Sequence, residues 1–244
     1  CGWFKNEFEM FGAQWNEHEV RYEYATEWLR FLKKIWTSEK EINFKGRWFN
    51  SKSVWSEPKP IQKPMPPVMN AGGSVAGKKF AATQTDMNFV LLKERNMEGG
   101  KAQVDNLKMM AKEIDRNIQV WIHVYVVCRE TEKEAKKYAD YYIVEKGDNV
   151  AVNNLLKIFG MQSETLPSDV LNEFRRHFIG GHGGYPLIGT PEQIVDGMND
   201  IIKMGINGIL ISWVDYKTEC QQWIDEIMPL MEQNGQRNSK PSLK

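Results

Sequence analysis

PVMNAGGSVAGKKFAAT, residues 67–83, reads as three consecutive pieces of structure. Val68 and Met69 end a short buried strand, Gly72-Gly73-Ser74 forms a tight turn, and a helix begins near Val75. The first backbone N–H groups of a helix have no partner within it, and the helix dipole places partial positive charge there. Glycine lets a ligand approach the backbone closely, and serine can cap the helix or donate its hydroxyl. The stretch therefore predicts either a phosphate-binding site or a plain tight turn.

Two nucleotide-binding motifs can be tested against this stretch. A P-loop requires G-x-x-x-x-G-K-[ST]. Gly72, Gly77 and Lys78 fit that pattern, but Lys79 stands where the magnesium-binding hydroxyl should be. The glycine spacing of a Rossmann G-x-G-x-x-G motif is not found here. We therefore exclude a nucleoside triphosphatase and expect a simpler phosphate monoester as the ligand.

The composition is that of an ordinary globular enzyme. The 244 residues are 41% hydrophobic and 26% charged, which allows a substantial core. Lys+Arg and Asp+Glu balance at 32 each, so neither nucleic acid nor a membrane surface is indicated as a partner. Cys1, Cys128 and Cys220 have neither metal-ligand spacing nor the pattern of a disulfide framework. We expect a cytoplasmic protein with no metal site.

Strands alternate with helices along the chain. Further strands are expected at Met87–Leu92, Ile118–Cys128 and Gly208–Trp213, and a small hairpin around Phe44–Phe49. A loop is expected over residues 4–16, and helices are expected near residues 17–36, 75–84, 101–115, 131–144, 150–160, 168–178, 191–205 and 218–233. Apolar strands separated by helices indicate a parallel sheet with crossover helices. Polar residues and glycines follow the strand ends, which favours a (β/α)8 barrel, of which this chain would hold the second half.

We expect residues 1–244 to form one domain, a partial barrel. Residues 1–37 would contain a strand end, a loop and a long helix whose tryptophans, Trp28 among them, belong to the core. Residues 64–130 would supply the central strands and the phosphate turn, and residues 234–244 a frayed tail. The first residues, Cys1-Gly2-Trp3, resemble the end of a strand whose beginning is missing.

Two further places carry candidate catalytic residues. His182 lies among four glycines in a glycine-rich loop, residues 179–190, which predicts either a hinged lid or a flexible surface loop with an incidental histidine. Trp213 follows the last strand, where barrel enzymes carry site residues. His123 alternates with apolar residues in a strand and is expected to be a satisfied interior residue. His18 is expected to be exposed.

The chain resembles the bacterial luciferase-like flavin monooxygenases, in the branch that includes alkanesulfonate, dimethyl sulfone and pyrimidine monooxygenases. The segments that carry this resemblance occur in the order of the family and cover nearly the whole chain. They are Cys1-Gly2-Trp3 with Glu7, Arg21-Tyr22, Asn70–Ser74, Gly184–Glu192, Gly208–Tyr216 and Met228–Met231.

The resemblance implies an α/β fold, the C-terminal portion of a luciferase-like (β/α)8 TIM barrel with a glycine-rich lid insertion, which binds reduced FMN. Glu7 matches an acid that contacts the flavin. Arg21 and Tyr22 match a pair that closes on the FMN phosphate, and Ser74 matches the serine that caps this phosphate. Asn70 either contacts the flavin or satisfies the turn. Gly72, Gly73 and Val75 would complete the phosphate site.

The activity implied is that of a monooxygenase which uses O2 and reduced FMN to oxygenate a small organosulfur or pyrimidine-like substrate. A separate NAD(P)H-dependent flavin reductase would supply the reduced flavin, and a homo-oligomer is expected. Three alternatives stay open: a relative that uses deazaflavin F420 for hydride transfer, a flavin-binding protein without catalysis, and a phosphate-handling aldolase or isomerase barrel.

Overall fold

The computed structural model describes residues 1–159 and 167–238. The predicted helix end at residue 160 and the last six residues of the predicted tail, 239–244, lie outside this range. The chain divides into two compact units, each made of two segments. Unit 1 comprises Cys1–Phe89 and Asn106–Gln119, and unit 2 comprises Val90–Asp105 and Val120–Lys244. The single partial-barrel domain over residues 1–244 stays a prediction.

Unit 1 contains the predicted hairpin and the predicted strand before the glycine turn. Strands β3 and β4 pair in parallel, Met69 opposite Met87 and Asn70 opposite Asn88, whereas β1 and β2 pair as an antiparallel hairpin. Its elements are α1 (Lys5–Met10), α2 (His18–Thr37), β1 (Ile42–Lys45), β2 (Asn50–Val54), β3 (Met69–Asn70), α3 (Val75–Gln84), most of β4 (Met87–Val90) and the end of α4 (Met97–Lys112). The predicted loop over residues 4–16 is wrong in part, because α1 lies within it.

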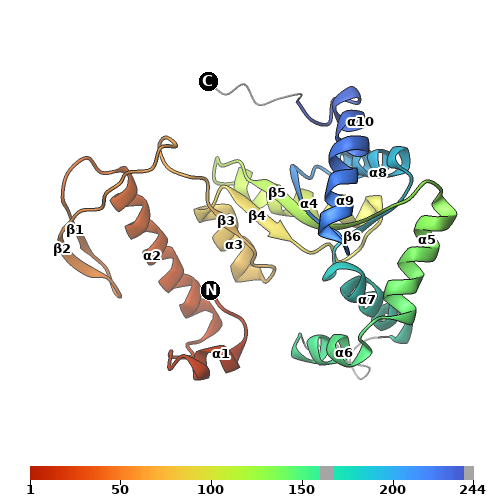
Figure 1. Ribbon diagram of the computed structural model, residues 1–244. Coiled ribbons are helices and arrows are strands. Elements are labelled where there is room, and N and C mark those ends of the chain that lie inside the picture. The colour runs from red at the N-terminus through yellow and green to blue at the C-terminus, as the bar shows by residue number, and fades with distance from the viewer. Residues whose placement is uncertain (160–166, 239–244) are drawn as a thin grey trace. The chain divides into compact units, whose positions relative to one another are not determined.

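The hairpin β1–β2 packs along one side of the long helix α2 (Figure 1). Phe31 packs against Phe44 and Phe49, with ring centroids 4.6 and 5.9 Å apart. The prediction that the tryptophans of this helix are core is wrong for Trp28, which is 47% exposed. Its side chain lines a cavity.

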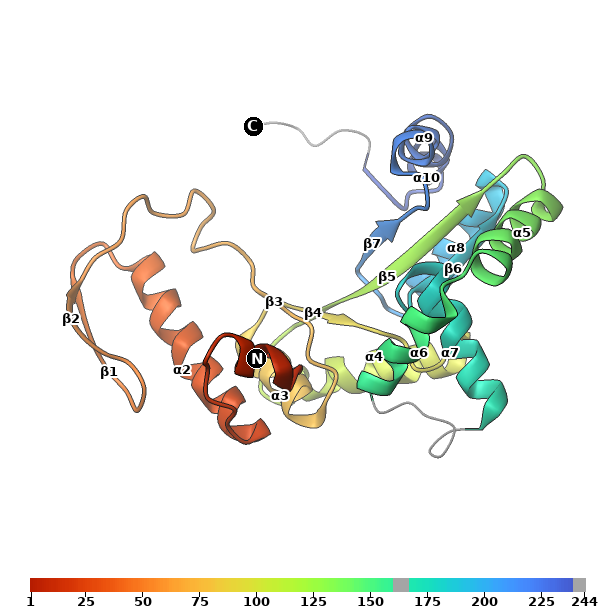
Figure 2. The ribbon, with the colours of Figure 1, turned by 60° about the horizontal axis from the view of Figure 1, so that its bottom comes forward.

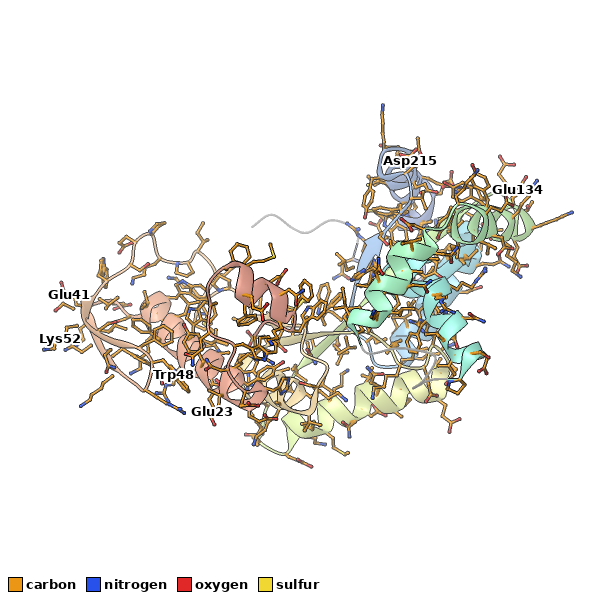
Figure 3. The ribbon with its side chains drawn as sticks, turned by 90° about the horizontal axis from the view of Figure 1, so that it is seen from below. Glu23, Glu41, Trp48, Lys52, Glu134 and Asp215 are labelled. Atoms are coloured by element: carbon orange, nitrogen blue, oxygen red, sulfur yellow. The ribbon has the colours of Figure 1, made fainter. Side chains whose placement is uncertain are left out.

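A single carboxylate fixes the turn of the hairpin. Glu27 on α2 accepts hydrogen bonds from the backbone N–H groups of Arg47 (2.8 Å), Trp48 (2.9 Å) and Phe49 (2.8 Å). A Cβ atom on Gly46 would overlap the Glu27 carboxylate, so glycine is required there for the close approach. Trp48 and Glu23 lie together at this contact, while Glu41 and Lys52 mark the outer part of the hairpin (Figure 3). Glu27 therefore holds the hairpin turn through backbone groups alone.

Unit 2 is built around the long strand β5 (Gln119–Cys128), which within this unit pairs in parallel with two other strands (Figure 2). Its first half pairs with β7 (Gly208–Ser212) and its second half with β6 (Tyr185–Gly189). The helices of this unit are α5 (Glu132–Asp140), η1 (Tyr141–Glu145, π-helix), α6 (Asn149–Ile158), α7 (Ser168–Gly181), α8 (Pro191–Lys203), α9 (Tyr216–Gln222), η2 (Trp223–Ile227, π-helix) and α10 (Met228–Gln233). Parallel strands separated by helices confirm the predicted α/β fold class.

The prediction of a glycine-rich loop over residues 179–190 is wrong. Gly180 and Gly181 end α7, and residues 185–189 form β6, whose Leu187 is 3% exposed. The glycines are needed for close packing, since a Cβ atom on Gly180 would lie 3.0 Å from the Tyr125 ring and one on Gly181 would overlap Tyr125. The segment is therefore a helix end, a tight turn and a strand.

Local signals at the helix starts are confirmed. Thr131 caps α5 by accepting the N–H of Glu134 at 3.2 Å. Thr190 and Gln193 form the predicted capping box of α8, with Pro191 at its first turn. Among the described residues, no helix combines the length and the apolar character that a membrane span requires.

The Glu27 contact predicts a pH-dependent stability. Burial acts to raise the pKa of Glu27, but the three backbone hydrogen bonds outweigh it and lower the pKa below 4.5. The ionised form therefore stabilises the fold above the ordinary glutamate pKa, and this stability is lost as the pH falls through the lowered pKa. We expect Glu27→Gln to lower Tm by several degrees at pH 7, measured by circular dichroism, and the difference from wild type to shrink in acid.

Glu23→Gln is the matched control for this variant. Glu23 also contacts the hairpin, through an exposed ion pair with Arg47 at 3.0 Å, and such pairs contribute little. Equal effects of the two substitutions, or a Glu27→Gln difference that persists at low pH, would contradict the role given to Glu27.

Candidate functional site

The glycine turn has the geometry of a capped helix start. Ser74 is the N-cap of α3, and its Oγ accepts the N–H of Gly77 at 3.1 Å. Asn70 accepts the N–H of Gly72 through its Oδ1 at 2.7 Å, so its side chain satisfies the turn. Val75 follows as the first helical residue and is 83% exposed. The predicted order of strand, turn and helix is confirmed, but the prediction that the strand is buried is wrong for Met69, which is 42% exposed.

The hydroxyl of Tyr22 lies over this turn. A Cβ atom on Gly72 would lie 2.6 Å from Tyr22 Oη, and one on Gly77 would lie 2.7 Å from the same oxygen. The Cβ atom on Gly77 would also lie 2.8 Å from the backbone of Gly72. Both glycines are therefore required for the approach of α2 to α3, whereas a Cβ atom on Gly73 would meet nothing within 4 Å.

His18 joins Tyr22 at the start of α3. Its Nε2 lies 3.3 Å from Ser74 Oγ, and its ring meets the Tyr22 ring edge-on at 5.2 Å. His18 and Tyr22 are four residues apart in α2, so they share one face of the helix. The sequence analysis predicts only that His18 is exposed. The four-residue spacing between His18 and Tyr22 is the signal from which its position beside the turn could have been predicted.

Arg21 points into a cavity of about 890 Å³ within unit 1. Its guanidinium lies 3.8 Å from the centroid of the Trp15 ring and 5.9 Å from that of Phe8. Its Nε and Nη1 atoms are buried without a hydrogen-bond partner. The cavity also reaches Asn70, whose side chain holds the turn, and it is lined by Met69, Trp28, Trp48 and Tyr24 as well.

Glu7 lies in the first turn of the short helix α1, and its side chain is exposed. The next residue, Phe8, lines the cavity. The structure thus brings together Tyr22, Asn70 and the Gly72–Ser74 turn, directs Arg21 into the adjoining cavity, and leaves Glu7 outside the cavity lining. The flavin contact of Glu7 stays a prediction.

The two candidate catalytic residues lie in unit 2. His182 is the left-handed C-cap of α7, with φ 47° and ψ 41°, and its ring contacts Phe178 edge-on at 5.7 Å. Trp213 directly follows β7 and is half-buried between the rings of Tyr216 and Trp223, at 5.8 and 6.0 Å. Their catalytic roles stay predictions.

The turn that carries His182 is held by a buried arginine. Arg95, whose side chain is 8% exposed, donates from Nη2 to the carbonyl of Gly183 at 2.8 Å and from Nε to that of Gly184 at 3.3 Å. Its Nη1 lies 3.8 Å from Glu173. Sequence reasoning missed Arg95, because no local pattern connects it to a turn almost ninety residues away.

Two hydrogen-bonded histidines lie in the interior of unit 2. His123 Nε2 lies 2.8 Å from Ser212 Oγ, as expected of a satisfied interior residue; burial, and secondly His182, lower its pKa. His177 Nδ1 lies 3.0 Å from the hydroxyl of Tyr125. Burial, together with Arg95 and Arg176, lowers the pKa of His177 to about 4, so this histidine is neutral at pH 7. Within residues 1–159 and 167–238, no group of three His, Cys, Asp or Glu side chains is placed to hold a metal ion.

The close packing of Tyr22 against Gly72 and Gly77 predicts that replacing one of these glycines by alanine lowers the stability of the chain. Replacing glycine by alanine inside a helix ordinarily stabilises it by about 1 kcal/mol. Gly77→Ala should instead destabilise the chain, because the new methyl group would meet the Gly72 backbone and the Tyr22 hydroxyl. Gly73→Ala is the control, with open space around its Cβ atom. Urea unfolding measures both, and a Gly77→Ala variant at least as stable as wild type would refute this packing.

The Arg95 contacts predict a loss of stability by a separate route. Arg95→Met removes the donors to two buried carbonyl groups, which should cost about 1–3 kcal/mol of unfolding free energy. Arg176→Lys serves as the comparison, because Arg176 forms an exposed ion pair with Asp140 at 2.7 Å and exposed pairs contribute little. An unchanged urea midpoint for Arg95→Met would show that the hydrogen bonds from Arg95 to Gly183 and Gly184 do not stabilise the turn.

Comparison with known proteins shows which family the chain belongs to. Residues 1–208 match the family described as luciferase-like monooxygenase. The chain is 30% identical over 235 residues to an FMNH2-dependent dimethylsulfone monooxygenase of Pseudomonas putida, a match that covers 94% of this chain and 64% of that protein. It is 27% identical over 238 residues to pyrimidine monooxygenase RutA of Acinetobacter baylyi, covering 94% of this chain and 63% of that one.

The fold is similar to that of a solved relative. The crystal structure of DmoA from Hyphomicrobium sulfonivorans superimposes with a TM-score of 0.77 at 19% identity, over 97% of this chain and 61% of that chain. The chain thus spans less than two thirds of the length of the relatives it matches. With its family match over residues 1–208 and the confirmed strand–turn–helix order, the chain belongs to the luciferase-like monooxygenase family.

Proposed function

We propose that this chain binds reduced FMN and serves a flavin-dependent monooxygenase that oxygenates a small organic substrate. The observation that carries the proposal is the guanidinium of Arg21, whose Nε and Nη1 atoms are buried without a hydrogen-bond partner in a cavity that Asn70 also lines. Burying N–H donors without acceptors is unfavourable. An anionic ligand in the cavity would supply the missing acceptors.

The residues present fit a flavin phosphate. The guanidinium of Arg21 offers a fork of donors that matches phosphate oxygens. The turn at Gly73-Ser74 offers backbone N–H groups and the positive end of the α3 dipole. The hydroxyl of Tyr22 lies over the same turn. The aromatic rings of Trp15, which stacks on the guanidinium, and of Trp28, which lines the cavity, offer flat apolar surfaces for the planar ring system of a flavin.

When bound, reduced flavin supplies the activation of O2, which no amino-acid side chain provides. The task of the chain is to bind the phosphate, to orient the ring system and to exclude water from it. His182 and Trp213 are proposed as the catalytic side chains, since Trp213 directly follows β7 and His182 lies in the turn between α7 and β6. Glu7 is proposed as a further flavin contact.

The relatives suggest the substrate class. One is named for dimethylsulfone and another for pyrimidine, so a small organosulfur or pyrimidine-like compound is the proposed substrate. The proposal includes an NAD(P)H-dependent flavin reductase as the partner that delivers reduced flavin, a homo-oligomeric state and a cytoplasmic location.

Flavin binding tests the proposal directly. We expect the chain to bind FMN with a micromolar Kd, followed by quenching of flavin fluorescence. The Arg21→Ala/Ser74→Ala double variant should weaken this binding by about 10- to 100-fold, since it removes charge-assisted hydrogen bonds. A Lys52→Ala variant, altered on the outer part of the hairpin, is the control and should bind like wild type.

Three results would overturn the proposal. The chain could ignore FMN, the double variant could bind as tightly as wild type, or deazaflavin F420 could bind in preference to FMN. The last result would favour the hydride-transfer relative. With FMN binding established, oxygen consumption with reduced FMN in the presence of dimethyl sulfone or uracil then tests the substrate class.

A further inference from the structure

A group of polar side chains, most of them buried, adjoins the turn that carries His182. Arg95, which binds this turn, is 8% exposed in its side chain, and Tyr125 on β5 is 2% exposed. Glu173 and His177, four residues apart on α7, complete the group. One carboxylate oxygen, Glu173 Oε1, lies 3.6 Å from His177 Nε2 and 3.8 Å from Arg95 Nη1. This carboxylate therefore connects the histidine of α7 with the arginine that binds the turn.

The hydrogen bond of Tyr125 determines which nitrogen of His177 carries the ring proton. Burial raises the pKa of Tyr125 to about 12, so its hydroxyl keeps its proton at pH 7. This hydroxyl lies 3.0 Å from His177 Nδ1. If Nδ1 carried the ring proton, the unprotonated Nε2 would face the Glu173 carboxylate, and two acceptors would oppose each other. Tyr125 therefore donates to Nδ1, and the single proton of the neutral ring lies on Nε2, toward Glu173.

Neutral His177 restricts the side chain of Glu173. Burial, and after it Arg95 and Arg176, lower the pKa of His177 to about 4, so the ring adds no charge to the group at pH 7. A glutamate side chain that is 58% exposed has several rotamers open to it. The Nε2–H of His177 favours the rotamer that places the carboxylate beside Arg95. In this rotamer the carboxylate compensates the buried positive charge of Arg95.

The direction of the Arg95 guanidinium affects the backbone of His182. With Nη1 toward Glu173, Nη2 and Nε donate to the carbonyl groups of Gly183 and Gly184, at 2.8 and 3.3 Å. His182 has φ 47°, a left-handed conformation that is unfavourable for a residue with a Cβ atom. Such a conformation persists only where the surrounding structure holds it. The polar group therefore connects β5 and α7 to the strained residue of the turn.

We propose that three side chains, those of Tyr125, His177 and Glu173, are positioning residues. They act through Arg95 on the backbone conformation of His182. The inference rests on the proposed function, in which His182 is a catalytic side chain. It gives a task to a buried tyrosine hydroxyl and a neutral buried histidine that the proposed flavin site does not use.

NMR of the histidine ring tests the first step. Long-range ¹H–¹⁵N spectra distinguish the two tautomers of a neutral imidazole, and wild-type His177 should be the Nε2–H form at pH 7. In Tyr125→Phe the ring should become a mixture of both tautomers, because Nδ1 has lost its donor. Tyr142→Phe is the matched control, since it removes another tyrosine hydroxyl, which donates to the carbonyl of Gly180 at 3.0 Å. It should leave the tautomer of His177 unchanged.

Relaxation-dispersion NMR tests the effect on the turn. The amides of residues 182–184 report excursions of the turn on the μs–ms timescale within the folded state, whatever the global stability. Tyr125→Phe and Glu173→Gln should each raise the population of the alternative conformation about tenfold, because each removes one link to Arg95. The amides of β7 should behave as in wild type.

Two further substitutions on α7 separate positioning from packing. His177→Gln retains an N–H donor within reach of Glu173, so it should disturb the turn less than His177→Leu. Arg175→Lys is the control, because Arg175 bonds to exposed side chains on the same helix and on α6, and it should leave the turn unchanged. Equal effects of His177→Gln and His177→Leu would show that the ring only fills space.

Several results would overturn the inference. They are an Nδ1–H tautomer of His177 in wild type, and a turn that is undisturbed in both Tyr125→Phe and Glu173→Gln. If the substituted chains do not fold, the wild-type tautomer decides. These measurements need no flavin, so a chain that binds no FMN would overturn the proposed function and leave the positioning of His182 intact. Where turnover with reduced FMN is measured, Tyr125→Phe should lower kcat about tenfold with KM changed less than about twofold. An unchanged kcat would contradict the catalytic purpose of this positioning.

Discussion

The approach of α2 to the first turn of α3 is the constraint on which the candidate site depends. Tyr22 lies against a pair of glycines, Gly72 and Gly77, that leave no room for a methyl group. Because α2 has 3.6 residues per turn, fixing Tyr22 also fixes the direction of its neighbours. His18, one turn earlier, is brought to Ser74, and Arg21, the preceding residue, is directed into the adjoining cavity that Asn70 also lines. One close contact thus sets the positions of three side chains around the turn and the adjoining cavity.

Two ionic side chains of α2 show how structural and binding roles differ. Glu27 is buried, and its carboxylate accepts three backbone N–H groups, so its charge is compensated within the chain. Arg21, six residues earlier, has two buried nitrogen atoms without an acceptor. Buried polar groups in folded proteins are nearly always hydrogen-bonded, so an exception calls for an explanation. The Glu27 carboxylate therefore needs no ligand, whereas the two nitrogen atoms of Arg21 are best explained by an anion that accepts their hydrogen bonds.

The sequence predicts well those features that depend on a few consecutive residues. The strand–turn–helix at Ser74, the hairpin near Gly46 and the capping box at Thr190 follow from local chemistry, and each is found in the structure. The position of His18 and the clamp by Arg95 depend on contacts between distant segments, which no local pattern encodes. The family resemblance named the Arg21–Tyr22 pair, but it did not reveal that the two side chains point to different places.

The glycines near His182 illustrate the same limit in another way. A run of glycines has two physical explanations, which are conformational freedom of the backbone and close packing of other groups against it. The sequence alone does not distinguish between them. Here Gly180 and Gly181 lie against Tyr125, Gly184 approaches His123, and only Gly183 of these four has a positive φ, of 78°. Arg95 then ties the turn to the rest of unit 2 through two carbonyl groups. A turn packed and bonded in this way holds His182 in a defined backbone conformation, so the close packing of these glycines, and not backbone freedom, explains their presence.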